Sequence, residues 1–159
     1  MAALSADAIR DFKNVEAQVT ETFAIKTSAT LYVGSLAAFT TIGRVQAAAA
    51  ATGLRPAGVV TEIVNESGSL ISAATGNTGG TVKAKIAWGH EVLVDVKTAA
   101  RTFANLGKNV FISTDNEVTD TTGAGTTAVR VKIGSMVELN AAKTQAWIAL
   151  RVYGDTDAV

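Results

Sequence analysis

Cysteine is absent from this chain of 159 residues, and histidine and proline each occur once. Without cysteine there is no disulfide, no thiol nucleophile and no zinc–thiolate centre. His90 has no second imidazole with which to build a two-histidine metal site. Pro56 stands at the head of an apolar run, where a missing N–H group matters least to a strand. These shortages exclude the commonest metal and thiol chemistries.

An excess of either charge is also lacking, because 14 basic residues balance 14 acidic ones. A domain that binds a nucleic-acid duplex normally carries a basic excess for the phosphates, so we expect no nucleic-acid partner. Nowhere do about 18 apolar residues follow one another, and we expect no membrane span. The start MAALSADAIR has no basic region followed by an apolar core, as a signal peptide would. We therefore expect synthesis in the cytoplasm, with the product soluble or assembled into something larger.

Residues 1–20 differ in pattern from the rest of the chain. Ser5 can cap a short helix in which Ile9, Phe12 and Val19 recur at roughly helical spacing. An isolated helix of about three to four turns is only marginally stable, so it needs its own domain or a neighbour to pack on. We therefore predict an N-terminal arm or short amphipathic helix over residues 1–20 and a β-rich domain over residues 21–159.

From Thr22 onward, short runs rich in valine, isoleucine, threonine and aromatics predict β-strands. Val129, Val131 and Ile133 alternate with polar residues, as in a strand with one buried face. Turn residues separate the runs. The predicted strands are 23–26, 31–39, 56–64, 81–88, 90–96, 109–114, 129–139 and 145–153. The pattern predicts a mainly β protein, a small antiparallel β-barrel or sandwich with an N-terminal arm or short helix.

The stretch GKNVFISTDNEVTDTTGAG (107–125) gathers four side chains that could hold a cation: Asp115, Asn116, Glu117 and Asp120. A calcium loop of the EF-hand type needs acids at alternate positions, followed by glycine and glutamate at set places. Here the first three are consecutive, so they cannot converge on one centre in an extended chain. Asp-Asn is also good turn chemistry, because both side chains bond locally. We predict a hairpin and no metal ligand.

Two glycine-rich stretches and the histidine are the other candidates for a binding or catalytic site. TGNTGG (75–80) leads into a strand, whereas a phosphate-binding Walker loop opens a helix. GAG (123–125) lacks the strand-before, helix-after context of a dinucleotide site. His90 and Asp95 are the only plausible start for a hydrolase, but no G-x-S-x-G nucleophile elbow is present. We therefore predict no catalytic residue, no cofactor and no enzyme activity.

Five segments in order resemble one known family. They are SATLYVGSLAAFTTIGRV (28–45), TGLRPAGVVTEIVNESG (52–68), GGTVKAKIAWG (79–89), NLGKNVFISTDNEVTDTTGAGTTAVRVKIGSMVEL (105–139) and AWIALRV (146–152). Taken together, they resemble the capsid decoration, or cement, proteins of tailed bacteriophages. The individual segments are degenerate, and it is their order along the chain that carries the resemblance.

The resemblance implies a structural virion protein on the capsid exterior, assembled in the host cytoplasm. Such a protein binds the outer surface of the shell, bridges neighbouring copies of the major capsid protein and stabilises the mature, DNA-filled shell. The resemblance also implies self-association, as a homotrimer. On this interpretation, Ile9, Phe12 and Phe23 are the candidate apolar contacts with a neighbour or with the shell.

Alternatives from other classes remain open. A tail-tube or neck component of a phage would also be β-rich and is the next hypothesis. A carbohydrate- or cell-surface-binding β module would be supported by aromatic side chains near loop tips. The tyrosines and tryptophans that bear on this fall on predicted strands instead: Tyr32, Trp88, Trp147 and Tyr153.

Overall fold

The computed structural model describes residues 10–51, 53–120 and 131–150, and β-strands dominate them. The helical elements in these ranges are three single 3-10 turns, η1 (Val15–Ala17), η2 (Thr98–Ala100) and η3 (Phe103–Asn105). The prediction of a mainly β, barrel-containing protein is confirmed. In the described ranges, no helix has the length and apolarity needed to cross a membrane.

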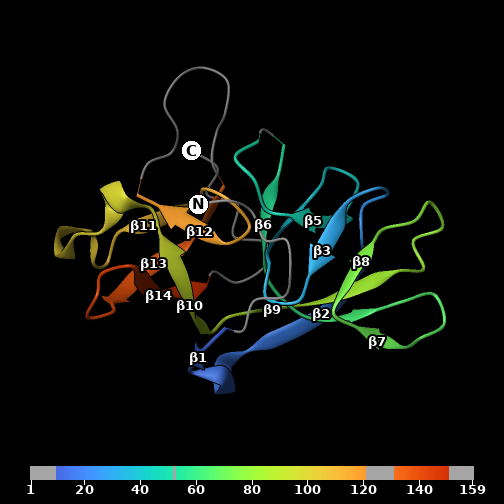
Figure 1. Cartoon of the computed structure of the whole chain (residues 1–159), viewed down its shortest axis with the longest axis horizontal. Coiled ribbons are helices and arrows are strands. Elements are labelled where there is room, and N and C mark those ends of the chain that lie inside the picture. Colours follow the sequence, from blue (N-terminus) through green and yellow to red (C-terminus); the bar gives the residue numbers. More distant parts are fainter. Residues whose placement is uncertain (1–9, 52, 121–130, 151–159) are drawn as a thin grey trace.

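The strands form two units that lie side by side in Figure 1. Unit 1 spans residues 19–88 and unit 2 spans residues 90–150. The described strands are β1 (Phe12–Lys13), β2 (Val19–Ala24), β3 (Thr30–Tyr32), β4 (Leu36–Phe39), β5 (Val45–Ala47), β6 (Arg55–Val64), β7 (Leu70–Ile71), β8 (Ala73–Thr75), β9 (Lys83–Trp88), β10 (Glu91–Val96), β11 (Asn109–Ile112), β12 (Glu117–Thr119), β13 (Lys132–Leu139) and β14 (Gln145–Leu150).

Unit 2 is a closed barrel of five strands. The strand order is β10-β12-β11-β13-β14, and β14 pairs with β10 to close the ring. Alternation in the sequence supplies the core, because successive side chains of a strand point to opposite faces. Along β10, for example, Val92, Val94 and Val96 are fully buried, while the residues between them are partly exposed.

Unit 1 is a five-stranded sheet in the order β2-β9-β6-β4-β5. It curls until Ile25, just after β2, forms a bridge with Val45 of β5. Phe39, Val60 and Ile86 are among the side chains that fill its interior. A short strand, β7, pairs with β6, and β3 and β8 form a separate two-stranded sheet.

The two units repeat one topology. β2, β4, β5, β6 and β9 of unit 1 correspond in order to β10, β11, β12, β13 and β14 of unit 2. In each unit, one parallel contact near the end of the first strand joins it to the third strand of the ring. In unit 1 it joins Ile25 to Val45, and in unit 2 it joins Val96 to Val118. Unit 1 has a further parallel bridge between Thr27 and Gly76.

The irregularities of the two units repeat as well. The ladder between β6 and β9 shifts register just after Val60, and the ladder between β13 and β14 shifts just after Met136. The backbone N–H of Gly34 donates to the carbonyl of Val60 at 2.8 Å, and that of Gly107 donates to the carbonyl of Met136 at 2.7 Å. Since β-bulges are specific features rather than defects, their agreement identifies the chain as a tandem structural repeat. The sequence pattern did not predict this repeat.

The units also differ in two places. Unit 1 has an insertion between β6 and β9, which contains β7 and β8, whereas residues 140–144 join β13 directly to β14. The second difference lies at the strand that opens each unit. β10 carries β1 on its outer edge, where Phe12 pairs with Val92, but β2 is paired only with β9 among the described strands.

Of the two forms predicted for residues 1–20, an arm or a short helix, the helix is not present over the described residues 10–20. From Arg10 the chain is extended, forms β1 against β10, makes the single turn η1 and enters β2. Pairing with an existing strand edge satisfies backbone groups at once, whereas a short isolated helix is only marginally stable. Residue 20, the predicted end of the arm, lies inside β2, and the residues before Arg10 lie outside the described part.

The two units share buried apolar surface. Leu36, Ala38 and Val59, from β4 and β6 of unit 1, belong to the same buried cluster as the interior of unit 2. The backbone N–H of Leu36 also donates to the carbonyl of Asp115 at 2.7 Å. Because burial of apolar area is the main stabilising term, this shared cluster holds the units at a fixed spacing.

We expect Gly134→Ala to lower the free energy of unfolding by about 2 kcal/mol or more, because a Cβ at this position would overlap the carbonyl oxygen of Ala149. Gly79→Ala is the matched control, since its Cβ would lie 3.8 Å from the nearest side chain, and we expect a change within about 0.5 kcal/mol. Urea unfolding of both variants measures the effect. Equal stability of the two would contradict the close approach of β13 and β14.

Candidate functional site

A partly buried polar cluster lies where the two units meet, and Arg10 is its centre. The Nε of Arg10 donates to the carbonyl of Gly34 in unit 1 at 2.7 Å. Its Nη2 donates to Oδ1 of Asn116 in unit 2 at 2.9 Å. One guanidinium thus bonds both units, which its planar arrangement of donors allows.

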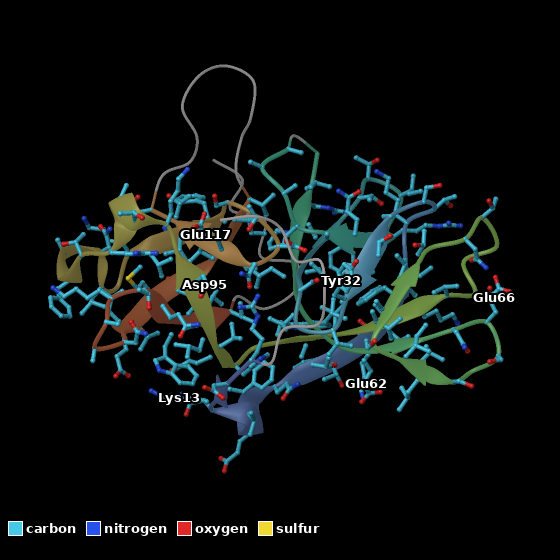
Figure 2. The ribbon with its side chains drawn as sticks, in the orientation of Figure 1. Lys13, Tyr32, Glu62, Glu66, Asp95 and Glu117 are labelled. Atoms are coloured by element: carbon cyan, nitrogen blue, oxygen red, sulfur yellow. The ribbon has the colours of Figure 1, made fainter. Side chains whose placement is uncertain are left out.

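The cluster continues into unit 2 through Asp95 on β10. The Nδ2 of Asn116 donates to one carboxylate oxygen of Asp95 at 2.8 Å, and Nε2 of Gln145 donates to the other at 3.0 Å. Figure 2 places Asp95 near Glu117, its partner in the parallel pairing of β10 with β12. Burial lowers the pKa of Arg10, while the carboxylates of Asp95 and Asp115 act in the opposite direction.

The hairpin predicted within residues 107–125 is present over residues 109–119, since β11 and β12 pair antiparallel and residues 113–116 form the turn between them. The sequence did not reveal that Asp115 and Glu117 would be buried, with only 2% and 4% of their surfaces exposed. In the ranges that the structure describes, no group of three or more acidic or histidine residues is placed to hold a metal ion. The hairpin contacts unit 1, since the carbonyl of Asp115 accepts from the N–H of Leu36.

His90 links β9 to β10 and is 2% exposed. The ring of Phe12 on β1 covers it, with the ring centroids 5.0 Å apart. Neither ring nitrogen has a hydrogen-bond partner among the described residues, so His90 and Asp95 do not form the pair that a hydrolase would need. Burial lowers the pKa of His90, while the nearby Trp88 backbone acts in the opposite direction.

The three predicted contact residues fall in different places. Ile9 lies outside the described residues. Phe12 is on β1 against unit 2, and 39% of its surface remains exposed. Phe23 is half-buried in unit 1, where its ring meets that of Phe39 edge to face at 4.7 Å. Phe12 thus keeps a free face, whereas Phe23 packs largely within its own unit.

Three of the four tyrosines and tryptophans fall in the described part of the chain, and all three lie on strands. Tyr32 is on β3, and Trp88 on β9 is 3% exposed. Trp147 on β14 lies under the Nζ of Lys13, 4.1 Å from the ring centroid. Tyr153 lies outside the described residues.

The TGNTGG stretch is a connection between β8 and β9, as predicted. Arg44 holds it by donating from Nη1 to the carbonyl of Asn77 at 3.0 Å and from Nη2 to that of Thr78 at 2.9 Å. These carbonyl groups face the guanidinium of the chain itself. The stretch therefore serves to close unit 1.

Comparison of the chain with protein-family models, with curated proteins and with solved structures finds no match. Two exposed apolar groups stand out on the surface of the chain. The first is in the N-terminal segment (Phe12, Val15 and Val19), and the second is in unit 2 (Phe103, Leu106 and Val137).

We expect Arg10→Ala to lower the free energy of unfolding by about 3 kcal/mol, because Asn116 and the nearby carboxylates lose their cation. Arg10→Lys should recover only part of this loss, since lysine keeps the charge but not the planar set of donors. Arg55→Ala, at an exposed arginine of β6, is the control and should change stability by less than about 0.5 kcal/mol. Denaturant unfolding measures the stability of the three variants. If all three are as stable as the parent, the role given to Arg10 is wrong.

We expect stability to fall as the pH drops below 6.5, the ordinary pKa of histidine. The folded protein holds His90 at a lower pKa, so the unfolded chain binds the proton more readily over that range. The stability that neutral His90 gives the folded protein is fully present above its ordinary pKa. It decreases as the pH falls toward the folded pKa, and the stability loss does not grow further below that value. Unfolding at about pH 7.5 and about pH 5.5 should show a smaller difference for His90→Phe than for the parent. An equal difference in both proteins would show that His90 is not responsible.

Proposed function

We propose that the chain is a structural protein of a tailed-phage virion that binds the outer surface of the capsid. In this role it bridges neighbouring copies of the major capsid protein and stabilises the mature, DNA-filled shell. The ordered sequence segments that resemble decoration proteins support the proposal, and so does the mainly β fold. The observation that carries it furthest is the tandem repeat of one barrel within a single chain.

A protein that bridges identical neighbours needs similar surfaces at a set separation. Units 1 and 2 have equivalent strands, and the Arg10 cluster and the shared apolar cluster hold them together. A rigid two-unit chain loses little conformational freedom when both units bind, and it makes the second attachment effectively intramolecular. Each contact then needs to be only of ordinary size, about 800 Å² on each partner.

The balance of charge suits a position outside the shell. With 14 basic and 14 acidic residues, the chain has no general attraction for the packaged DNA. The proposal includes assembly in the host cytoplasm and association of the chain with itself, as a homotrimer. Phe12 is the candidate shell contact that the structure describes with a free face, at 39% exposure.

The proposal predicts saturable binding of the purified protein to mature shells that have been stripped of it. Sedimented shells should carry a number of copies commensurate with the icosahedral lattice, and their melting temperature should rise. Phe12→Ala should weaken binding about tenfold, as expected for loss of one buried aromatic anchor. Ile42→Ala, at a side chain that is 73% exposed in unit 1, is the control and should bind as the parent does.

Because Phe12 also covers His90, the melting temperature of each free variant must be measured beside its binding. If Phe12→Ala loses binding only in proportion to a loss of folded protein, Phe12 belongs to the barrel and not to a contact. If the parent does not bind shells at all, the capsid proposal fails. Labelling of intact virions with an antibody would then test the tail-tube or neck hypothesis.

A further inference from the structure

Unit 2 exposes an apolar patch beside its β13–β14 turn. Phe103, Leu106 and Val137 are 59%, 40% and 44% exposed. Hydrogen bonds from Gly107 to Met136 (2.7 Å) and from Met136 to Lys108 (3.0 Å) place the strand ends side by side, so that Leu106 lies near Val137. In Figure 1 the turns over residues 98–105 stand at the outer end of unit 2.

The equivalent place in unit 1 is covered by the insertion that unit 2 lacks. Counting back from β4 and β11, Val33 corresponds to Leu106, and β3 corresponds to η3. Val33 donates its N–H to the carbonyl of Ser72 at 2.9 Å and packs on the core of unit 1. β3 pairs with β8. Without such a cover, the unit 2 patch has the exposed apolar character of an interaction surface.

Lysines surround this patch. Lys97 and Lys108 are exposed, and the Nζ of Lys143 lies 4.5 Å from the ring centroid of Phe103. Neither of the contributing segments, residues 97–108 and residues 140–144, contains an acidic residue. Asp120 bonds the first of them, since it accepts from Nδ2 of Asn105 at 2.9 Å, and the lysines remain in excess. Glu138, next to Val137, is paired with Lys13 at 2.9 Å. We name this surface the cationic patch (Phe103, Leu106, Val137, Lys97, Lys108 and Lys143).

A second surface has the opposite charge. Val15 and Val19 are 51% and 49% exposed, and Glu16 and Glu21 are exposed beside them in sequence. Residues 15–21 contain no basic residue. This segment runs into the start of β2. Among the described strands β2 pairs only with β9, whereas β10, its equivalent in unit 2, also pairs with β1. We name it the anionic patch (Val15, Glu16, Val19 and Glu21).

We infer that the anionic patch of one copy binds the cationic patch of a second copy of this chain. Each patch offers apolar side chains that the fold leaves uncovered, and each has charged residues that complement those of the other. Oppositely charged patches favour encounter and correct orientation, while burial of the apolar groups supplies affinity. The contact joins unlike surfaces, so it generates a ring, such as the proposed homotrimer, where the rotation between copies closes, and an open chain of copies where it does not.

This inference deepens the self-association within the proposed function, but it does not depend on capsid binding. The test uses the isolated full chain, whereas the capsid proposal is tested by sedimentation of shells. An association without shell binding would overturn only the capsid proposal. Shell binding by a chain that stays monomeric in solution would overturn only the inference drawn here.

The experiment compares two charge-reversed variants by sedimentation equilibrium at low salt. In Glu16→Lys/Glu21→Lys both patches are basic, and in Lys108→Glu/Lys143→Glu both are acidic. We expect each variant alone to associate at least about tenfold more weakly than the parent, since like charges then face each other. In an equimolar mixture each copy of one variant should bind a copy of the other, because opposite charges again meet, so the average mass should rise above that of either variant alone.

A matched control is Arg55→Glu/Lys83→Glu, which reverses two exposed basic residues of unit 1 and should associate as the parent does. Salt at about 0.5 M should weaken the parent assembly, since it screens exposed charges. If the variants associate when they are mixed, they are folded, and the weak association of each variant alone is due to the lost contact. A parent that is monomeric at all concentrations, or variants that do not re-associate on mixing although their melting curves match the parent's, would overturn the inference.

Discussion

The guanidinium of Arg10 is the interaction on which the arrangement of the molecule depends. It bonds the carbonyl of Gly34 in one unit and the side chain of Asn116 in the other, and Asn116 in turn holds Asp95. Burial of a cation is costly unless polar partners compensate for the lost water. Because those partners come from both units, the cluster is complete only when the units are docked. The hydrogen bonds therefore set the position in which the shared apolar cluster is buried.

Each unit is formed by the same local physics. Alternating apolar residues line the interiors, and bulges at equivalent places bend the longest ladders. Close approach of neighbouring strands requires glycine, and Gly134 lies against the carbonyl of Ala149 as Gly58 lies against that of Ala87. The repeat is thus conserved in backbone geometry even where the side chains differ. Such a repeated geometry gives one chain two similar surfaces, which is the property that bridging of identical neighbours needs.

The differences between the units decide what remains exposed. An insertion covers one side of unit 1, while the corresponding side of unit 2 presents Phe103 and Leu106. β1 covers an edge of unit 2 that unit 1 leaves open at β2. The two units share one strand arrangement, and the segments added to each of them therefore decide which surfaces remain available to partners. Their opposite charges also explain how a chain with no net charge can still carry strong local electrostatic preferences.

The sequence by itself determined the β class, most strand positions and the hairpin over residues 109–119, because alternation and turn chemistry act locally. It did not determine the tandem repeat, since register depends on backbone geometry that different residues can share. For the N-terminal segment it left an arm and a short helix open, because the strand β10 that residues 12–13 pair with is remote in sequence. Only the tertiary structure decided that Asp115 would be buried, that Arg10 would bond both units and that Phe103 would be exposed. The physical reason is that burial depends on which distant segment covers a side chain, and no local pattern records it.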